Sequence, residues 1–477
     1  MNSYSGADVE FALFDPLTVI NKDQQAVPYL AKSVTPNAGF TQWTVTLRPG
    51  VRFADGSTLT ATDLQQDFTQ YFAQPTSADY GTFINIKSIK VVNSLTAVFV
   101  LNAADSQFPT VLTSYFPFNP DVKAKYGADW QAHPDGTGPF ELVKWSQGNE
   151  TVLKRNPHYW LKGPGGNQLP YLSELIFKPI TDDTTRVSTL QSGGIDGMLS
   201  EVPMTLQSAA AVPDTTILDS GGNGGYGLFF NAMEAPVNDV RVRLALAHAT
   251  NVAAMLAASG GGKYNQLRDQ YYPPGSPWYS PAVASAWPAY NVAEAKTLIH
   301  EYVADPHRSD GKPVGSPVTL TLNYEPGSPQ QLAVAQLAQQ EWKQIGVQVT
   351  IRPEDEATLV GNALKGSFQV NYFEWGNELP YDLFHHNYLP RPANLTNFTL
   401  FNNASIIQQI GVLQTATSQS VIKNAVDKIG LLLDQNVPLI FIGSAPAAWA
   451  VNTSKVGGAS IISPLLASID WATIWAK

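Results

Sequence analysis

The chain has 477 residues, of which 44% are hydrophobic and 14% charged, with 29 Lys and Arg against 39 Asp and Glu. At about 100–200 residues per domain, the length predicts two to four domains with a large buried core. The formal net charge of −10 argues against a nucleic-acid-binding protein and against a polybasic membrane-surface protein. The absence of cysteine excludes disulfides, Cys-ligated metals and thiol nucleophiles, and is typical of an oxidising compartment.

The chain start and its hydropathy bear on localisation. No apolar run reaches about 18 residues, so we expect no transmembrane helix. The first residues, Met1-Asn2-Ser3-Tyr4, lack the basic and apolar regions of a signal peptide. We therefore expect either a cytosolic protein or one whose leader has been removed.

The first third of the chain predicts a mixture of strands and helices. Alternating polarity predicts a strand at residues 43–47, and Asp55-Gly56 predicts a turn. Thr60-Ala61-Thr62-Asp63 resembles a capping box and predicts a helix through residue 72. Residues 86–101 predict a β-hairpin that turns at Asn93-Ser94.

The middle of the chain contains a glycine-rich segment. Strands are predicted at residues 140–143 and 151–154, and five glycines then fall within residues 221–227. This segment precedes a predicted strand at residues 228–230 instead of opening a helix, so it is not typical of a phosphate loop. It predicts a flexible or closely approached backbone, and Asp239 is predicted to cap a following helix.

The last part of the chain predicts a parallel sheet. Pro, Gly and Tyr are concentrated at residues 271–290, which predicts a surface excursion. A strand at 319–322, a helix at 331–344 and a strand at 347–351 predict a parallel βαβ unit. A further helix at 420–434 precedes a strand at 439–442.

No catalytic or metal-binding motif is evident. The seven histidines form no zinc helix, and no nucleophile or nucleotide-binding motif is present. His385 and His386, with Asp382, could ligate a metal, but adjacent side chains point apart, which favours surface or supporting positions. We therefore expect no enzyme activity, no cofactor and no metal.

Four segments together resemble a known family, the extracytoplasmic solute-binding proteins of bacterial ABC importers, in the dipeptide/oligopeptide-binding group (solute-binding protein family 5). The resemblance extends from about Phe14 to Lys477. The segments are Tyr29-Leu30-Ala31-Lys32-Ser33 with residues 47–64, Gly136-Thr137-Gly138-Pro139-Phe140 with residues 154–160, Arg186 with residues 190–196, and residues 230–247 around Asp239-Val240-Arg241-Val242-Arg243.

The resemblance implies a two-lobe α/β periplasmic-binding-protein-like fold, type II and cluster C-like, with an extra subdomain inserted in the first lobe. Lobe I would be discontinuous and comprise residues 1–33, 135–252 and 455–477. The inserted subdomain would comprise residues 34–134, and lobe II residues 253–454. The lobes would close on the ligand by a hinge.

The resemblance also implies a function. The protein would capture a peptide outside the cytoplasm, in the periplasm or on a lipid anchor, and deliver it as a monomer to the membrane permease of an ABC importer. Alternatives are an oligosaccharide or another non-peptide or cationic solute, and an envelope regulatory protein without a transport role. No nucleic acid is expected as a partner.

Peptide-binding members of the family carry a motif like W-x-A-D-Y-x-x-P, in which the Asp pairs with the α-amino group of the ligand. The matching stretch here is Trp375-Gly376-Asn377-Glu378-Leu379-Pro380, so Glu378 falls on the Asp position. The resemblance implies that Trp375, Gly376, Asn377 and Glu378 line the ligand site. An ordinary loop carboxylate at Glu378 is the alternative.

Other positions depart from the oligopeptide-binding pattern. Tyr372 stands where some relatives have Arg, and Glu356 where some have a pocket Trp, while Glu374 adds another acid. A cleft rich in acids and aromatic rings suits an amine, a cation or a sugar. The alignment further places Tyr4 and Ser5, and Gly225 and Tyr226, at the cleft, and core burial of Tyr226 is the alternative.

Overall fold

The computed structural model describes residues 4–72, 80–391, 394–464 and 467–477, and only the backbone of residues 4, 5, 71, 72, 80 and 81. The chain forms two compact units. Unit 1 comprises residues 1–201, 205–222 and 447–477, and unit 2 comprises residues 202–204 and 223–446. The lobe boundaries implied by the family resemblance stay a prediction.

Unit 1 contains a four-stranded antiparallel sheet in the order β3-β4-β6-β5. Its strands are β3 (Ala31–Pro36), β4 (Gln42–Leu47), β5 (Ile86–Asn93) and β6 (Thr96–Leu101). The predicted strand and hairpin are thus present. Helix α2 (Ala61–Asp67) starts at the predicted capping box, where the Thr60 amide donates to the Asp63 carboxylate at 2.7 Å. Buried side chains such as Trp43, Leu64 and Phe99 form the core between the sheet and this helix.

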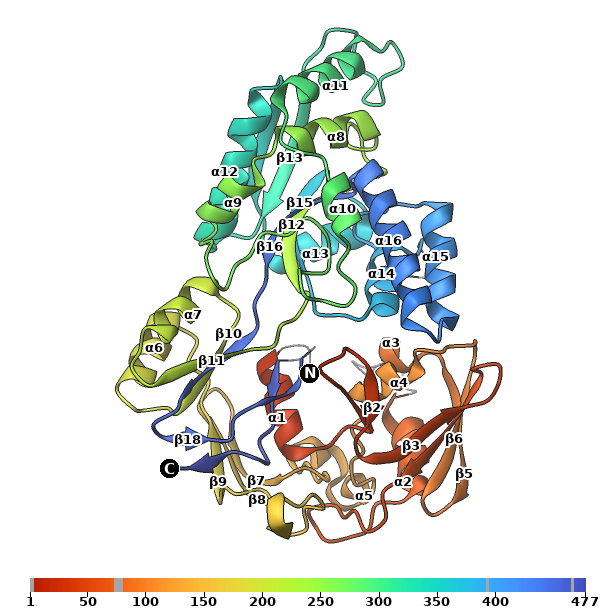
Figure 1. Cartoon of the computed structure of the whole chain (residues 1–477), viewed down its shortest axis with the longest axis vertical. Coiled ribbons are helices and arrows are strands. Elements are labelled where there is room, and N and C mark those ends of the chain that lie inside the picture. Colours follow the sequence, from red (N-terminus) through yellow and green to blue (C-terminus); the bar gives the residue numbers. More distant parts are fainter. Residues whose placement is uncertain (1–3, 73–79, 392–393, 465–466) are drawn as a thin grey trace. The chain divides into compact units, whose positions relative to one another are not determined.

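The rest of unit 1 is built on two three-stranded sheets, β7-β8-β9 and β10-β17-β11 (Figure 1). Helix α1 (Tyr4–Leu13) packs near β7, and C-terminal residues such as Trp449 and Trp471 join its core. The strands are β7 (Phe140–Ser146), β8 (Glu150–Arg155), β9 (Glu174–Phe177), β10 (Gly197–Ser200), β11 (Thr215–Asp219) and β17 (Ala448–Asn452).

Shorter elements connect these sheets. They are β1 (Thr18–Ile20), β2 (Ala26–Pro28), η1 (Phe68–Phe72), α3 (Tyr80–Phe83), α4 (Phe108–Val111), η2 (Leu112–Ser114), α5 (Asp121–Tyr126), η3 (Gly127–Ala132), η4 (Pro164–Gly166), α6 (Asp183–Gln191), α7 (Pro203–Ala210), β18 (Val456–Gly457), β19 (Ile461–Ser463), β20 (Ser468–Ile469) and β21 (Trp475–Ala476).

Unit 2 is organised around a five-stranded mixed sheet in the order β14-β13-β15-β12-β16. β13 (Val318–Tyr324), α12 (Pro329–Lys343) and β14 (Val347–Pro353) form the predicted parallel βαβ unit. Gly346 enters β14 with φ 86°, a conformation that favours glycine. β15 (Val370–Trp375) is parallel to β13, whereas β12 (Gly225–Phe230) is antiparallel to both β15 and β16 (Leu439–Ser444).

Helices cover both faces of this sheet (Figure 1). One core contains Leu228, Phe230 and residues of α8 (Val240–Ala249), α9 (Val252–Ala258), α11 (Val292–Ala304) and α12. The other contains Phe229 and residues of α14 (Pro380–Tyr388), α15 (Ala404–Thr415) and α16 (Gln419–Asn436). Successive residues of β12 therefore enter opposite cores, as strand geometry requires. Helices α10 (Pro281–Ala286) and α13 (Glu356–Lys365) complete the unit.

The prediction of a surface excursion at residues 271–290 is wrong for three of its aromatic residues, whereas Tyr290 is 52% exposed. Tyr271, Tyr272 and Trp278 are at most 4% exposed and belong to the core beside α14 and α16. The Pro and Gly residues set the irregular path of the backbone, while the rings supply the buried apolar area.

Candidate functional site

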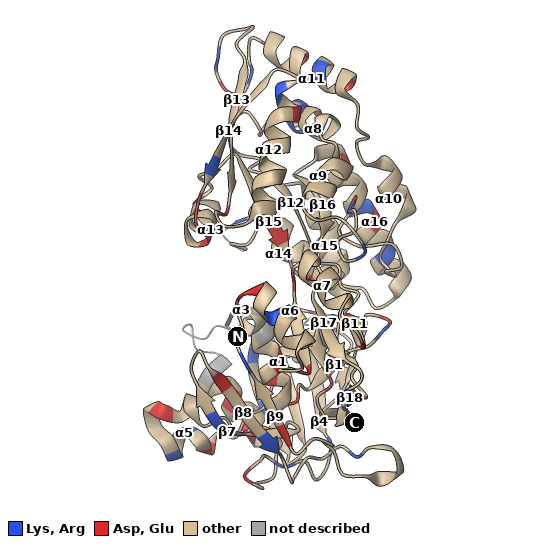
Figure 2. Cartoon of the chain, turned by 90° about the vertical axis from the view of Figure 1, so that its left-hand side faces the viewer, with Lys and Arg blue, Asp and Glu red and all other residues tan. Residues whose placement is uncertain are grey.

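The carboxyl ends of β13, β14 and β15 lie at one edge of the unit 2 sheet, because these three strands are parallel. Acidic residues gather there: Glu325 follows β13, Glu354, Asp355 and Glu356 follow β14, and Glu374 lies near the end of β15. Figure 2 shows acidic segments at α13 and β15. The crevice outside the carboxyl ends of parallel strands is where ligands bind in many α/β proteins.

Pairing of β12 with β15 brings together most of the predicted ligand-binding residues. Gly225 lies opposite Trp375, and Tyr226 lies opposite Glu374. A Cβ atom on Gly225 would lie 2.3 Å from Cζ2 of Trp375, so only glycine permits this approach. The glycine-rich segment therefore allows close packing of the backbone, which is one of the two roles that the sequence predicted for it.

The loop from Gly376 to Leu379 is fixed by hydrogen bonds to the segment before β12. The Glu378 amide donates to Oδ1 of Asn223 at 3.0 Å, and Nδ2 of Asn223 donates to the Glu378 carbonyl at 2.9 Å. Asn377 accepts from the Gly224 amide through its Oδ1. Asn223 and Asn377 are 3% and 8% exposed, so these bonds are shielded from water.

Trp375 lies in the aromatic core of unit 2. Its ring contacts Tyr271 and Phe441 edge-on, with centroids 5.2 and 5.5 Å away. Its Nε1 donates to the Asn223 carbonyl at 2.8 Å. The ring therefore supports the loop that carries Glu378.

Glu378 forms an ion pair with His386 of α14, with 2.9 Å between Oε1 and Nδ1. Its second oxygen, Oε2, is buried and has no hydrogen-bond partner among the described residues. The two side chains are 28% and 48% exposed. The carboxylate is thus partly accessible, with one oxygen engaged and one enclosed.

The two neighbouring histidines differ in protonation. Burial and the charge of His386 together lower the pKa of His385 to about 4, so His385 is neutral at pH 7. For His386, burial opposes protonation, but the hydrogen bond and charge of Glu378 and the charge of Asp382 raise its pKa. Glu378 and Asp382 therefore favour the protonated form of His386.

Tyr226 and Tyr372 stack on each other, with ring centroids 5.5 Å apart at 20°. Both are 5% exposed and belong to the core of unit 2. The Tyr226 hydroxyl contacts Ser259 Oγ at 2.5 Å and donates to Asn265 Oδ1 at 3.1 Å. Burial raises the pKa of Tyr226, and the charge of Glu374 adds to this effect.

The remaining predicted residues lie apart from this group or outside the described side chains. Glu356 is exposed in the first turn of α13, after the carboxyl end of β14. Gly376 is exposed, and a Cβ atom there would contact nothing within 4 Å. The side chains of Tyr4 and Ser5, in α1, lie outside the described residues.

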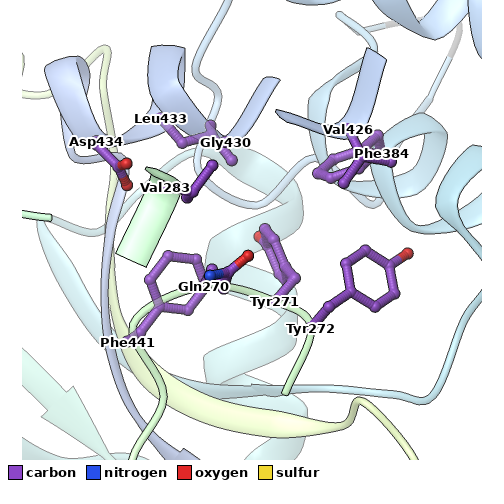
Figure 3. Close-up of a pocket in the computed structure, with 10 residues that line it drawn as sticks. All are labelled: Gln270, Tyr271, Tyr272, Val283, Phe384, Val426, Gly430, Leu433, Asp434 and Phe441. Carbon is purple, nitrogen blue, oxygen red and sulfur yellow. The ribbon is translucent and has the colours of Figure 1, made fainter. Parts of the chain in front are cut away.

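A small cavity lies behind the aromatic core, between residues 270–272, α10, α14 and α16 (Figure 3). It has room for about one water molecule. Asp434 lines it, is 4% exposed, and neither of its carboxyl oxygens has a hydrogen-bond partner among the described residues. Burial raises the pKa of Asp434 to about 8, helped by the charge of Asp269.

Sequence reasoning missed three residues of the site: Asn223, Tyr272 and His386. Asn223 is the only non-glycine residue of 221–225, a usable signal that the segment makes a specific contact. The Tyr272 hydroxyl reaches the Glu378 carbonyl at 3.4 Å from a segment predicted to lie on the surface. His386 was considered only with Asp382 and His385, although it lies two turns of helix after Glu378.

In the part of the chain that the structure describes, no helix is long and apolar enough to cross a membrane. Within the same residues, no group of three or more His, Cys, Asp or Glu is arranged to hold a metal ion.

Comparisons with known proteins bear on the family. The family model described as "Bacterial extracellular solute-binding proteins, family 5 Middle" matches residues 25–392. The "Glutathione-binding protein GsiB" of Salmonella paratyphi A (strain ATCC 9150 / SARB42) is 27% identical over 356 residues, which cover 72% of this chain. The match spans 64% of that relative's length.

Solved structures share the fold. The putative peptide binding protein AppA from Clostridium difficile has a TM-score of 0.83 at 18% identity, over 99% of this chain and 96% of that one. NikA from Brucella suis, in complex with Fe(III)-EDTA, has a TM-score of 0.81 at 19% identity, over 100% of this chain and 96% of that one. These similarities confirm the predicted α/β binding-protein fold. Since the family model covers most of the chain, the protein belongs to the bacterial extracellular solute-binding proteins of family 5.

Proposed function

We propose that this protein captures a solute outside the cytoplasm and delivers it to the membrane permease of an ABC importer, without chemistry of its own. Membership of the solute-binding family is the observation that carries the proposal. The proposed mechanism is closure of two lobes on the ligand, which shields their contacts from water. The lobes would have the boundaries implied by the family resemblance.

The proposed ligand is a peptide with a free α-amino group, and Glu378 is its anchor. Glu378 occupies the position of the amine-binding Asp in peptide-binding members. Its backbone is fixed on both sides by Asn223. A loop held in advance reduces the entropy lost on binding, because its conformation does not have to be selected by the ligand.

A second ligand class, a non-peptide cationic or hydroxyl-rich solute, is favoured by the acidic sheet edge. Tyr372 replaces the Arg of some oligopeptide-binding relatives, and it is stacked in the core. Glu374 is exposed near the carboxyl end of β15, and Glu356 is exposed in the first turn of α13, after β14. Such a surface attracts cations.

A thermal-shift panel distinguishes these classes. A ligand that binds only the native state raises the melting temperature, by RT ln(1 + [L]/Kd) in free energy. The panel contains free peptides, the same peptides with acetylated amino groups, neutral sugars, and metal chelates. Stabilisation by free peptides but not by acetylated ones supports the peptide-amine proposal, and stabilisation by sugars or chelates alone contradicts it.

Solution scattering tests closure. The radius of gyration should fall when the stabilising ligand is added, and the ligand should be recovered unchanged. A chemically altered ligand would contradict the proposal that the protein only binds.

A further inference from the structure

The two oxygens of the Glu378 carboxylate are not equally available. Oε1 is 2.9 Å from Nδ1 of His386, and Oε2 is buried without a partner among the described residues. A carboxylate oxygen can accept two hydrogen bonds, so Oε1 keeps one acceptor site beside the imidazole. A ligand ammonium that reaches Glu378 from solvent therefore meets His386 at the same oxygen, where two neighbouring positive charges repel each other.

The charged groups around His386 determine what its displacement does. On α14, Asp382 favours its protonation, while His385 is neutral at pH 7 because its pKa is about 4. Helix α15, which packs against α14, carries no charged residue. From the segment after α14, the Arg391 guanidinium donates to the carbonyls of residues 363, 364 and 397, so it does not face Glu378 as a partner.

We propose that His386 is a built-in competitor for Glu378, so that a cationic ligand end and the protonated imidazole occupy the same carboxylate by turns. This inference rests on the proposed role of Glu378 as the ligand anchor. It assigns His386 the role of a residue that sets the pH dependence and the charge preference of the site.

The exchange balances in charge. In the empty site the imidazolium donates from Nδ1 to Oε1 of Glu378. When a ligand ammonium donates to Glu378 instead, the imidazolium loses its partner and gains a neighbouring positive charge. Burial, the largest influence on its pKa, and the charge of the ligand then outweigh Asp382, so the proton of His386 passes to solvent. One cation enters the site and about one proton leaves it.

A definite pH dependence follows. Affinity for an amine ligand rises with pH while the empty site holds the imidazolium and the occupied site holds neutral imidazole. This window includes the ordinary histidine pKa of about 6.5, and the rise is at most tenfold per pH unit. Acid therefore weakens capture, because it favours the internal pair.

The first test needs no ligand. Histidine ring signals are followed by NMR titration in the full chain and in Glu378→Gln. The His386 pKa should fall in Glu378→Gln, because the charge that raises it is removed. The His385 signals are followed as well, but they are no fixed reference, because the charges of Glu378 and His386 both act on the pKa of His385. An unchanged His386 pKa overturns the inference.

The second test measures binding of trialanine by calorimetry between pH 5.5 and 8, in buffers of different ionisation enthalpy. The parent should release a proton on binding and gain affinity with pH. His386→Asn should bind about tenfold or more tightly than the parent at pH 5.5 and lose most of this pH dependence. The matched control, His385→Asn, should keep the dependence of the parent.

The outcomes separate the two proposals. If trialanine binds with the same pH dependence in the parent and in His386→Asn, the competitor role is wrong while Glu378 can still be the anchor. If neither trialanine nor any other free amine binds at any pH, the proposed peptide ligand fails, and the inference fails with it.

Discussion

The side chain of Asn223 forms hydrogen bonds with both the backbone amide and the backbone carbonyl of Glu378. Its side-chain oxygen accepts from the Glu378 amide at 3.0 Å, and its side-chain nitrogen donates to the Glu378 carbonyl at 2.9 Å. The amide of asparagine presents one acceptor and two donors, so it can take the place of a neighbouring strand for a single residue. This contact ties the start of β12 to the loop after β15.

Asn223→Ala should therefore weaken ligand binding and reduce stability. Without the side chain, the Glu378 amide loses its partner, at a cost of about 1–3 kcal/mol, and the Glu378 carbonyl keeps only the longer contact with the Tyr272 hydroxyl. We expect a lower thermal midpoint and a higher Kd for the ligand found in the thermal-shift panel. Asn291→Ala is the matched control, because it removes the Asn cap of α11. The control should lose about 1 kcal/mol of stability with an unchanged Kd, and equal binding by both variants would contradict the positioning role of Asn223.

Glu378→Gln should remove most of the affinity for a free-amine ligand. Truncating one half of an enclosed charge pair typically costs about 2–5 kcal/mol, a loss of about thirtyfold to several thousandfold. The empty protein should keep its thermal midpoint, since the pair with His386 is partly exposed and worth at most about 1 kcal/mol. Glu301→Gln, on the exposed face of α11, controls for net charge. Parent-like affinity in Glu378→Gln would exclude Glu378 as the anchor.

Much of the fold could be predicted from local patterns. The βαβ unit of residues 318–353 follows from apolar periodicity and from Gly346, because the secondary structure there is encoded within a short window. The order β14-β13-β15-β12-β16 places β12 next to strands that lie at least 140 positions away in sequence. No local pattern specifies such pairings, and they were not predicted from the sequence.

The candidate site likewise has a part that could be predicted from the sequence and a part that could not. Glu378 was found by alignment to a motif, whereas its contacts with Asn223 and His386 depend on how distant backbones approach each other. Tyr271 and Tyr272 were misplaced because irregular backbone was taken to mean exposure. A rule based on turn residues describes the backbone path, and it carries no information on what the aromatic side chains pack against.

Gly225→Ala should destabilise unit 2 through Trp375. The added methyl group would lie 2.3 Å from the Trp375 ring and 2.7 Å from the Gly443 carbonyl, so the ring or the strand must move. Overpacking of this kind typically costs about 1–3 kcal/mol, and it disturbs the bond from Trp375 to Asn223. Denaturant unfolding should show the loss. In the control Gly361→Ala, on α13 with open space around the added group, stability should stay equal or rise.

Asp434 should make stability fall as pH rises. Its pKa is raised from 3.8 to about 8 in the native state, so between these values the native protein binds a proton that the unfolded chain has released. The free energy of unfolding then decreases with pH, by at most about 1.4 kcal/mol per unit for this group, and the contribution of the neutral carboxyl is fully present only below about pH 4.

The variant Asp434→Asn tests this, because it keeps the shape of the side chain but cannot ionise. Thermal midpoints of parent and variant should be closest at pH 5, and at pH 8.5 the variant should be the more stable protein. Other buried acids, such as Asp15 with a pKa of about 7, titrate alike in both proteins and cancel in the difference. A midpoint difference that is constant from pH 5 to 8.5 would show that Asp434 is not held neutral beside the cavity.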